Sequence, residues 1–258
     1  MKSVLTIAGS DSSGGAGIQA DIKTITVHGL YATSAITALT AQNTTGVFGV
    51  LNTPAEFVAK QIDSVFDDIR PDAVKIGMLG SSEIISVIAE RLDFYNAENI
   101  VLDPVMVAAS GSKLLPEDAH QTLVSKLFPL ARVITPNIPE AEVLCGVKIK
   151  NKEDMEKEAK ALSKMLLGAI LIKGGHFLYS ADDLLFENEK YYWYHEKRID
   201  TLNTHGTGCT LSSAIACNLA LGFNLFESVK KAKEYLTKAI RANLNLGKGN
   251  GPLNHMVK

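Results

Sequence analysis

Short apolar runs alternate with longer amphipathic stretches along most of this chain. The apolar runs have the length of strands and occupy residues 4–8, 34–39, 73–76, 100–102, 133–135 and 169–173. They are almost continuously apolar rather than alternating, which is typical of strands that are buried on both faces. Helical patterns separate the runs, so the sequence predicts an α/β fold in which a mostly parallel central sheet is flanked by helices.

Three of the intervening stretches carry clear helix signals. Residues 18–28 follow the first predicted strand, and Thr53, Pro54 and Glu56 predict another helix start with Thr53 as its N-cap. That helix has an apolar face made of Phe57, Ile62, Val65 and Ile69. Near the end of the chain, apolar residues at helical spacing predict a helix that covers one side of the sheet, namely Val229, Ala232, Leu236, Ala239 and Ile240.

A small β-hairpin is predicted at the periphery of the main sheet. Residues 182–187 and 191–195 have strand patterns and are separated by Asn188, Glu189 and Lys190. The aromatic residues 191–194 form either a contact with a second copy of the chain or one face of the hairpin. No internal repeat or linker interrupts the sequence, so we expect residues 1–258 to form a single domain.

The composition points to a small-molecule partner. The 258 residues are 46% hydrophobic and carry a formal net charge of −2 without any run of like charges, so neither nucleic acid nor a membrane is an expected partner. The three cysteines, Cys145, Cys209 and Cys217, are scattered and odd in number, which favours a reducing compartment. The apolar run at 4–8 is too short for a signal peptide, and residues 29–55 are too polar to span a membrane, so we expect a cytoplasmic location.

The segment 205–210 (His-Gly-Thr-Gly-Cys-Thr) has the pattern of an anion-binding turn. Gly206 and Gly208 flank Thr207, and the small-residue helix that follows adds the positive end of its dipole. Cys209 then lies on the first helical turn, where a thiol becomes more acidic and can serve as a base or nucleophile. The alternative is an ordinary glycine-rich helix start beside an inert, buried cysteine.

A second glycine-rich loop, residues 9–17, follows the first predicted strand. Residues 15–20 satisfy the dinucleotide-binding pattern, but residues 29–55 contain no acidic residue to hold a ribose, and no Gly-Lys-Ser/Thr follows as in a P-loop. We interpret the loop as a wall where a ligand comes close to the backbone, with a purely structural turn as the alternative.

Polar side chains follow several predicted strands directly. Asp103, Asn137, Glu140 and Lys173 all lie beyond the carboxyl ends of strands, where ligands bind in open parallel sheets. Asn137 and Glu140 are three residues apart at a helix start and can share a face that holds Mg²⁺ through water, or they can serve as a cap and a solvated charge. His176 and His205 have no spaced partner and are expected to form hydrogen bonds in loops rather than to catalyse.

Taken together, the segments 8–21, 40–44, 75–78, 103–107 and 206–209 closely resemble the hydroxymethylpyrimidine/phosphomethylpyrimidine kinases of thiamine biosynthesis, in the ribokinase-like superfamily. The resemblance implies a ribokinase-like three-layer sandwich, and ATP as the donor to the hydroxymethyl group of 4-amino-5-hydroxymethyl-2-methylpyrimidine and then to its monophosphate. It also implies Mg²⁺ and a homodimer, and it leaves open whether a monovalent cation assists. Ribokinase relatives usually carry aspartate where this chain has Cys209.

The resemblance also assigns residues to the substrates. It places Gln42 against the aminopyrimidine, since a carboxamide complements a ring nitrogen beside an exocyclic amine, puts Met78 on the ring face and makes Asp21 a contact of the hydroxyl. It assigns four residues to the Mg·ATP phosphate region, with the ion held mostly through water at Asp103 and Glu140: Asp103, Asn137, Glu140 and Lys173.

The mechanism that follows is phosphoryl transfer at the 206–209 turn. Gly206, Thr207, Gly208 and Cys209 present backbone amides to the γ-phosphoryl group, and the Cys209 sulfur accepts the proton of the attacking hydroxyl. The helix start lowers the pKa of the thiol while nearby phosphate raises it, so base catalysis by Cys209 is a hypothesis.

Three alternatives stay open at this point. Similar cysteine-bearing pyridoxal kinases share most of these motifs, and some use a second cysteine in the lid segment; residues 107–112 contain none, which favours the pyrimidine, although Ala109 stands where lysine is frequent. A non-catalytic pyrimidine-sensing protein is the second alternative, and the combination of anion-binding turn and metal-type residues argues against it. A nicotinamide oxidoreductase is the third and rests on the glycine pattern at 15–20 alone.

Overall fold

A computed structural model of the chain describes residues 1–106, 116–175 and 180–257. In this part of the chain nine strands form one sheet in the order β3-β2-β1-β4-β5-β6-β7-β8-β9. Neighbouring strands pair in parallel along the stretch β2-β1-β4-β5-β6-β7. At one edge β3 is antiparallel to β2, and at the other edge β8 is antiparallel to β7 and β9 is antiparallel to β8. The strand bounds are β1 (Ser3–Asp11), β2 (Tyr31–Asn43), β3 (Gly46–Asn52), β4 (Ala73–Ile76), β5 (Ile100–Leu102), β6 (Val133–Ile134), β7 (Ala169–Ile172), β8 (Asp183–Glu187) and β9 (Lys190–Tyr194).

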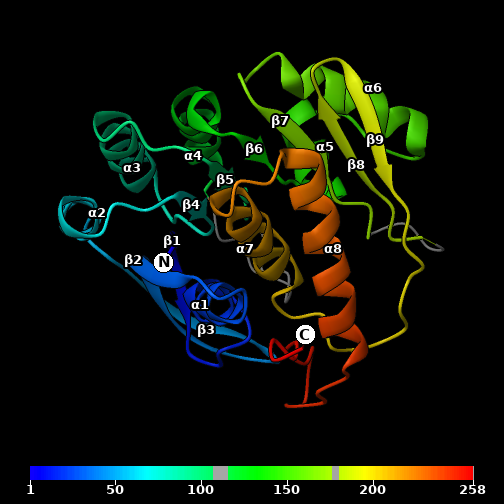
Figure 1. Ribbon diagram of the computed structural model, residues 1–258, viewed down its shortest axis with the longest axis horizontal. Helices are drawn as coiled ribbons and strands as arrows, with labels where there is room; N and C mark the ends of the chain where they lie inside the picture. The colour runs from blue at the N-terminus through cyan, green and yellow to red at the C-terminus, as the bar shows by residue number, and fades with distance from the viewer. Residues whose placement is uncertain (107–115, 176–179, 258) are drawn as a thin grey trace.

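Helices cover both faces of this sheet, as Figure 1 shows. One layer contains α2 (Ala55–Asp68), α3 (Ser82–Phe94), α4 (Glu117–Thr122), α5 (Ile138–Cys145) and α6 (Lys152–Ser163), and the other contains α1 (Gly17–Val27), α7 (Thr207–Ala220) and α8 (Leu225–Arg241). A π-helical turn (Leu123–Leu127) and a 3-10 turn (Phe128–Leu130) follow α4. The predicted ribokinase-like three-layer arrangement is confirmed.

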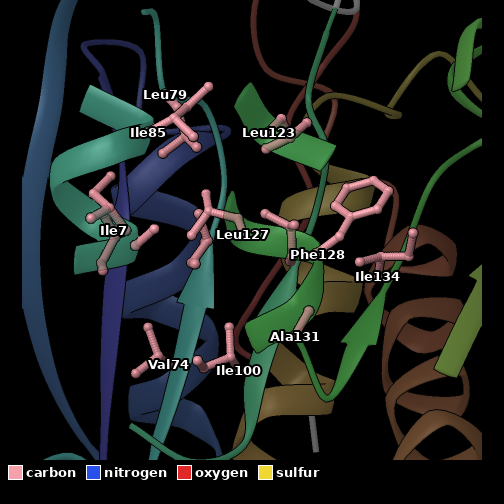
Figure 2. Close-up of a cluster of buried hydrophobic side chains, with 14 of the residues drawn as sticks. Ile7, Val74, Leu79, Ile85, Ile100, Leu123, Leu127, Phe128, Ala131 and Ile134 are labelled. Atoms are coloured by element: carbon pink, nitrogen blue, oxygen red, sulfur yellow. The ribbon is translucent and has the colours of Figure 1, made fainter. Parts of the chain in front are cut away.

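Each central strand sends alternate side chains into two separate hydrophobic cores. On β5, Ile100 and Leu102 enter the core under α2 to α6, which Figure 2 shows in part, whereas Val101 enters the core under α1, α7 and α8. On β7, Ile170 enters the core under α2 to α6 and Leu171 enters the core under α1, α7 and α8. Burial on both faces explains why these strands are apolar throughout.

The predicted strands are all present, but the sheet is larger than the sequence predicted. The run at 34–39 is the middle of β2, which continues to Asn43 and pairs with β3, an antiparallel strand that was not predicted. β3 is exposed along most of its length, so no alternating pattern distinguishes it.

The peripheral hairpin is also confirmed. β8 and β9 are joined by Asn188 and Glu189, both with positive φ, as a tight primed turn requires. Of the aromatic residues, Tyr192 and Tyr194 contact Phe226 on α8, and Trp193 donates a hydrogen bond to Glu156 on α6. These contacts show the aromatic residues packing within the chain.

Two details predicted for the helix near residue 53 are wrong. The N-cap is Pro54 rather than Thr53, whose N–H donates to the Thr37 carbonyl of β2 instead. Phe57 is 54% exposed, because the face that packs on the core is formed by Val58, Ile62 and Phe66. The helix at the end of the chain is confirmed as α8. No helix among the described residues is long and apolar enough to cross a membrane.

Candidate active site

The carboxyl ends of the parallel strands and the start of α7 meet at one edge of the sheet. A Cβ placed on Gly208 would lie 3.2 Å from Asp103 Oδ2 and 3.4 Å from Lys173 Nζ. Asp103 follows β5 and Lys173 follows β7, and their side chains form an ion pair of 2.7 Å. The structure therefore brings the predicted anion-binding turn against the predicted phosphate residues, at the edge where parallel sheets bind ligands.

The turn itself is built by a close contact between two glycine-rich loops. Gly206 is the N-cap of α7 and has a φ of +83°, which favours glycine. A side chain on Gly206 would overlap the carbonyl group of Gly15, in the loop between β1 and α1. Because the N-cap residue is glycine, its own side chain cannot satisfy the first N–H groups of α7, which leaves them suited to an anion.

Cys209 lies on the first turn of α7 and is partly buried. Burial raises the pKa of its thiol to about 11, against the effect of the Lys75 ammonium, while the carboxylates of Asp21 and Asp103 add to the increase. The backbone N–H of Gly17, the first residue of α1, hydrogen-bonds to the sulfur and opposes the shift. The thiol is therefore protonated at neutral pH in this state, and burial outweighs the Lys75 ammonium and the Gly17 N–H, which both lower the pKa.

Asp103, Lys173 and Glu140 form the charged side of the site. Thr135 donates a hydrogen bond to Asp103 Oδ1, which also accepts from Lys173. Burial alone would lower the pKa of Lys173, but Asp103 and Glu140 raise it above its ordinary value. Burial raises the pKa of Glu140 to about 7, although Lys173 opposes this.

Asn137 and Glu140 form a capping box at the start of α5. The Asn137 side chain accepts from the Glu140 N–H at 2.9 Å, and Glu140 Oε2 accepts from the Asn137 N–H at 2.8 Å. Within the described residues, no three His, Cys, Asp or Glu side chains converge on a metal-type position. Mg²⁺ fits such a sparse set, because it keeps several waters and binds through one or two carboxylates together with substrate phosphates.

The loop between β1 and α1 is organised by Asp11, which the sequence analysis did not single out. Its carboxylate accepts hydrogen bonds from the backbone of Ser13, Gly15 and Ala16, from the Ser13 hydroxyl and from His205 Nε2. Burial alone would raise the pKa of Asp11, but these bonds, led by that from His205, lower it to about 2. An Asp directly before two serines and two glycines is the local signal that could have identified it. His205 forms a loop hydrogen bond, as predicted.

The predicted pyrimidine residues lie at the ends of β2 and β4. Gln42 is half-buried, with its carboxamide between Thr40 Oγ1 at 3.1 Å and His205 Nε2 at 3.4 Å. The Met78 sulfur lies 3.1 Å from the position of a Cβ on Gly9 in β1, so that glycine makes room for it. Through His205, which precedes Gly206 in the chain, Gln42 is connected to the turn that begins α7.

Asp21 is completely buried on α1, and three protein groups bind its carboxylate. Oδ2 accepts from Thr6 at 2.6 Å and from Lys75 at 2.8 Å, and Oδ1 accepts from Ser213 of α7 at 2.8 Å. Lys75 is also 0% exposed, and although burial would lower its pKa, the Asp21 carboxylate raises it. The sequence analysis missed Lys75, yet a lysine within the apolar run 73–76 is a signal, since a buried ammonium needs a carboxylate.

The lid segment 107–112 and His176 lie outside the described residues.

Comparison with known proteins identifies relatives of this chain. The model of the phosphomethylpyrimidine kinase family covers residues 11–254. The hydroxymethylpyrimidine/phosphomethylpyrimidine kinase of Haemophilus influenzae is 47% identical over 260 residues, which cover 99% of this chain and 97% of that protein. The thiamine biosynthesis bifunctional protein ThiED of Geobacter sulfurreducens is 51% identical over 256 residues, and this chain spans 52% of its length.

Solved structures show the same similarity in three dimensions. A phosphomethylpyrimidine kinase from Clostridium difficile has a TM-score of 0.84 at 48% identity, with 93% of this chain and 100% of that chain covered. The ADP complex of Bacillus subtilis pyridoxal kinase has a TM-score of 0.92 at 37% identity, with 99% and 97% covered. Kinases of two substrate types thus share this fold.

Proposed function

Because this chain belongs to the phosphomethylpyrimidine kinase family, we propose that it phosphorylates 4-amino-5-hydroxymethyl-2-methylpyrimidine with ATP and then phosphorylates the resulting monophosphate, in thiamine biosynthesis. The observation that carries this proposal is the position of Gly208 against the Asp103–Lys173 pair at the start of α7. A helix N-terminus, a lysine and a carboxylate at one point provide the positioning and the charge stabilisation that phosphoryl transfer needs.

Two sets of residues at this edge of the sheet have different roles, one binding the phosphates and the other holding the metal ion. Amides of Gly206, Thr207, Gly208 and Cys209 bind the transferred phosphoryl group, and Lys173 supplies a fixed positive charge beside it. Asp103 and Glu140 would hold Mg²⁺, mostly through water, with Asn137 fixing the position of Glu140. When bound, Mg²⁺ neutralises part of the phosphate charge.

Cys209 is proposed to accept the proton of the attacking hydroxyl. With a thiol pKa of about 11, only about 10⁻⁴ of the enzyme carries a thiolate at pH 7. The kcat of the wild-type enzyme should therefore rise about tenfold per pH unit between pH 7 and 9, if chemistry limits turnover. Cys209→Ala should lose both this slope and most of the activity, and a folded Cys209→Ala enzyme with full kcat would contradict the role.

Gln42, Met78 and Asp21 are proposed to define the pyrimidine site. The Gln42 carboxamide offers one donor and one acceptor to the ring nitrogen and the exocyclic amine, and Met78 covers the ring face. Asp21, proposed as the hydroxyl contact, already binds Thr6, Lys75 and Ser213, so this contact requires one of them to give way.

We also propose a single domain that forms a homodimer in the cytoplasm. The sheet runs without interruption from β3 to β9 in the described residues, and its β2–β3 edge exposes large apolar side chains that a second copy would cover, namely Leu39, Phe48, Val50 and Leu51. The free cysteines favour a reducing compartment. Sedimentation of the wild type and of Phe48→Asp tests the dimer, since the substitution should shift the protein toward monomer.

One assay decides between the candidate functions. ATP consumption is measured in parallel with hydroxymethylpyrimidine, its monophosphate and pyridoxal, and turnover is expected with the first two. Turnover with pyridoxal alone would establish the second candidate, which the similarity to Bacillus subtilis pyridoxal kinase favours. A folded protein that consumes ATP with none of the three would instead support a pyrimidine sensor.

A further inference from the structure

The Gln42 carboxamide lies between two side chains whose other hydrogen bonds determine where its oxygen and its nitrogen belong. The structure places Oε1 3.1 Å from Thr40 Oγ1 and Nε2 3.4 Å from His205 Nε2. Whether these two ends stand as drawn or must be exchanged depends on which of the two neighbours has a proton to donate. The two ends of a carboxamide have the same shape, so their partners assign them.

Thr40 has a single hydroxyl proton, and that proton is already used. Thr40 Oγ1 lies 2.8 Å from the carbonyl oxygen of Ser10, which can only accept. The hydroxyl proton therefore points to Ser10, and Thr40 presents lone pairs to Gln42. The end of the carboxamide beside Thr40 must then be the NH₂ group, because an oxygen there would face another acceptor.

His205 makes the same demand from the opposite side. Its Nε2 lies 2.8 Å from Asp11 Oδ2, and Asp11 accepts four further hydrogen bonds from Ser13, Gly15 and Ala16. A carboxylate so surrounded is ionised, so Nε2 carries the proton and has no lone pair to offer. The end of the carboxamide beside His205 must be the oxygen, because an NH₂ group there would face an N–H whose proton points to Asp11 and would find no acceptor.

We propose that Thr40 and His205 are positioning residues that hold the Gln42 carboxamide in one orientation, with NH₂ toward Thr40 and oxygen toward His205, and that this orientation selects an aminopyrimidine over its 4-oxo counterpart. The inference rests on the proposed function for the identity of the substrate. It adds to that function the reason why a glutamine, which can present its donor and acceptor in either order, discriminates between the two rings.

The discrimination follows from the order of donor and acceptor on each ring. In the aminopyrimidine, a ring nitrogen acceptor lies beside an exocyclic amine donor. In the 4-oxo form the ring nitrogen carries a proton and the exocyclic group is a carbonyl, so the order is reversed. A carboxamide free to turn by 180° matches both rings, whereas a fixed one leaves the 4-oxo form with two unmatched polar contacts.

The test in solution is a comparison of kcat/KM for the two hydroxymethyl compounds in the wild type, Thr40→Val and Thr40→Ser. Valine has the shape of threonine without its hydroxyl, so Thr40→Val should narrow the preference for the aminopyrimidine by about tenfold, roughly the effect of one lost hydrogen bond. Thr40→Ser keeps the hydroxyl and should retain the preference within about twofold, and the KM for ATP should be unchanged in both. An unchanged preference in a folded Thr40→Val enzyme would overturn the proposal.

A second measurement needs neither the Thr40 variants nor enzymatic activity. In the wild-type protein, the side-chain NH₂ protons of Gln42, assigned by their loss in Gln42→Glu, should show nuclear Overhauser contacts to the Thr40 methyl group and none to the His205 ring. Contacts to the His205 ring, or to both residues, would refute a single orientation. If the enzyme turned over neither pyrimidine, the proposed function would be refuted. The nuclear Overhauser measurement would still determine the orientation of the Gln42 carboxamide.

Discussion

Replacing Lys75 with methionine removes the ammonium from the buried Asp21–Lys75 pair and leaves the carboxylate in place. Both side chains are 0% exposed, and their charged atoms are 2.8 Å apart. Methionine nearly matches the volume of lysine, so the change is mainly electrostatic. Breaking a buried pair by removing one partner costs about 3–5 kcal/mol, because the remaining charge is desolvated without compensation.

The structure places the expected loss at the lower end of that range. Thr6 and Ser213 continue to donate hydrogen bonds to the carboxylate after Lys75 is gone. We therefore expect the free energy of unfolding to fall by about 3 kcal/mol, which corresponds to a decrease in Tm of about 6–12 °C for a protein of this size. Adding Asp21→Asn to Lys75→Met should recover about 1 kcal/mol or more, since the amide is neutral.

The assay is urea unfolding, followed by circular dichroism and by the fluorescence of the single tryptophan, Trp193. The matched control is Lys148→Met, which breaks the Lys148–Glu142 pair of 2.6 Å, in which the lysine side chain is 77% exposed. That substitution should cost less than about 1 kcal/mol. Equal losses for Lys75→Met and Lys148→Met would refute the reasoning, because burial would then have no effect on the energy of the pair.

Further predictions concern the active-site turn and the buried titratable groups. Gly206→Ala should remove most of the kcat and lower the free energy of unfolding by at least about 1 kcal/mol. The reason is that Gly206 has a φ of +83° and that a Cβ there would overlap the Gly15 carbonyl. Steady-state kinetics and thermal unfolding measure the two effects. Asp11, with a pKa lowered from 3.8 to about 2, contributes about 2 kcal/mol of stability above pH 4 that is lost as the pH falls through 2. The stability difference between wild type and Asp11→Asn should therefore shrink from pH 5 to pH 2, and a constant difference would contradict the prediction. Burial lowers the pKa of His255 from 6.5 to about 4, so its neutral form stabilises the fold above pH 6.5 and this stability is lost between pH 6.5 and pH 4. The decline in unfolding free energy over that interval should be smaller in His255→Gln, and an equal decline would count against the prediction.

Local signals in the sequence were sufficient for the elements with one strong pattern. β4 and β5 were predicted at their observed bounds because strands buried on both faces are almost continuously apolar, Lys75 of β4 being the exception. The start of α7 was predicted because glycines on either side of Thr207 act on the backbone locally. The capping box of Asn137 and Glu140 was visible as one alternative, since its two residues are only three apart.

Where two local solutions compete, a neighbouring strand decides between them. Thr53 has the side chain of an N-cap, but its N–H donates to the Thr37 carbonyl of β2, and the Pro54 carbonyl accepts the first helical hydrogen bonds, from Phe57 and Val58, so the helix begins after Pro54. β3 was missed because its exposed residues need no periodic pattern, and only its pairing with β2 makes it a strand.

The sequence by itself determined the central parallel strands, the presence of helices on either side of them and the glycine turn, because hydrophobic periodicity and glycine conformation act over a few residues. Only the tertiary structure decided which polar groups meet. Asp11 and His205 are 194 residues apart and Asp21 and Ser213 are 192 apart, so no spacing connects them. They pair because the parallel topology places β1, α1 and α7 together, and because a charged group buried in that space would be costly without a partner.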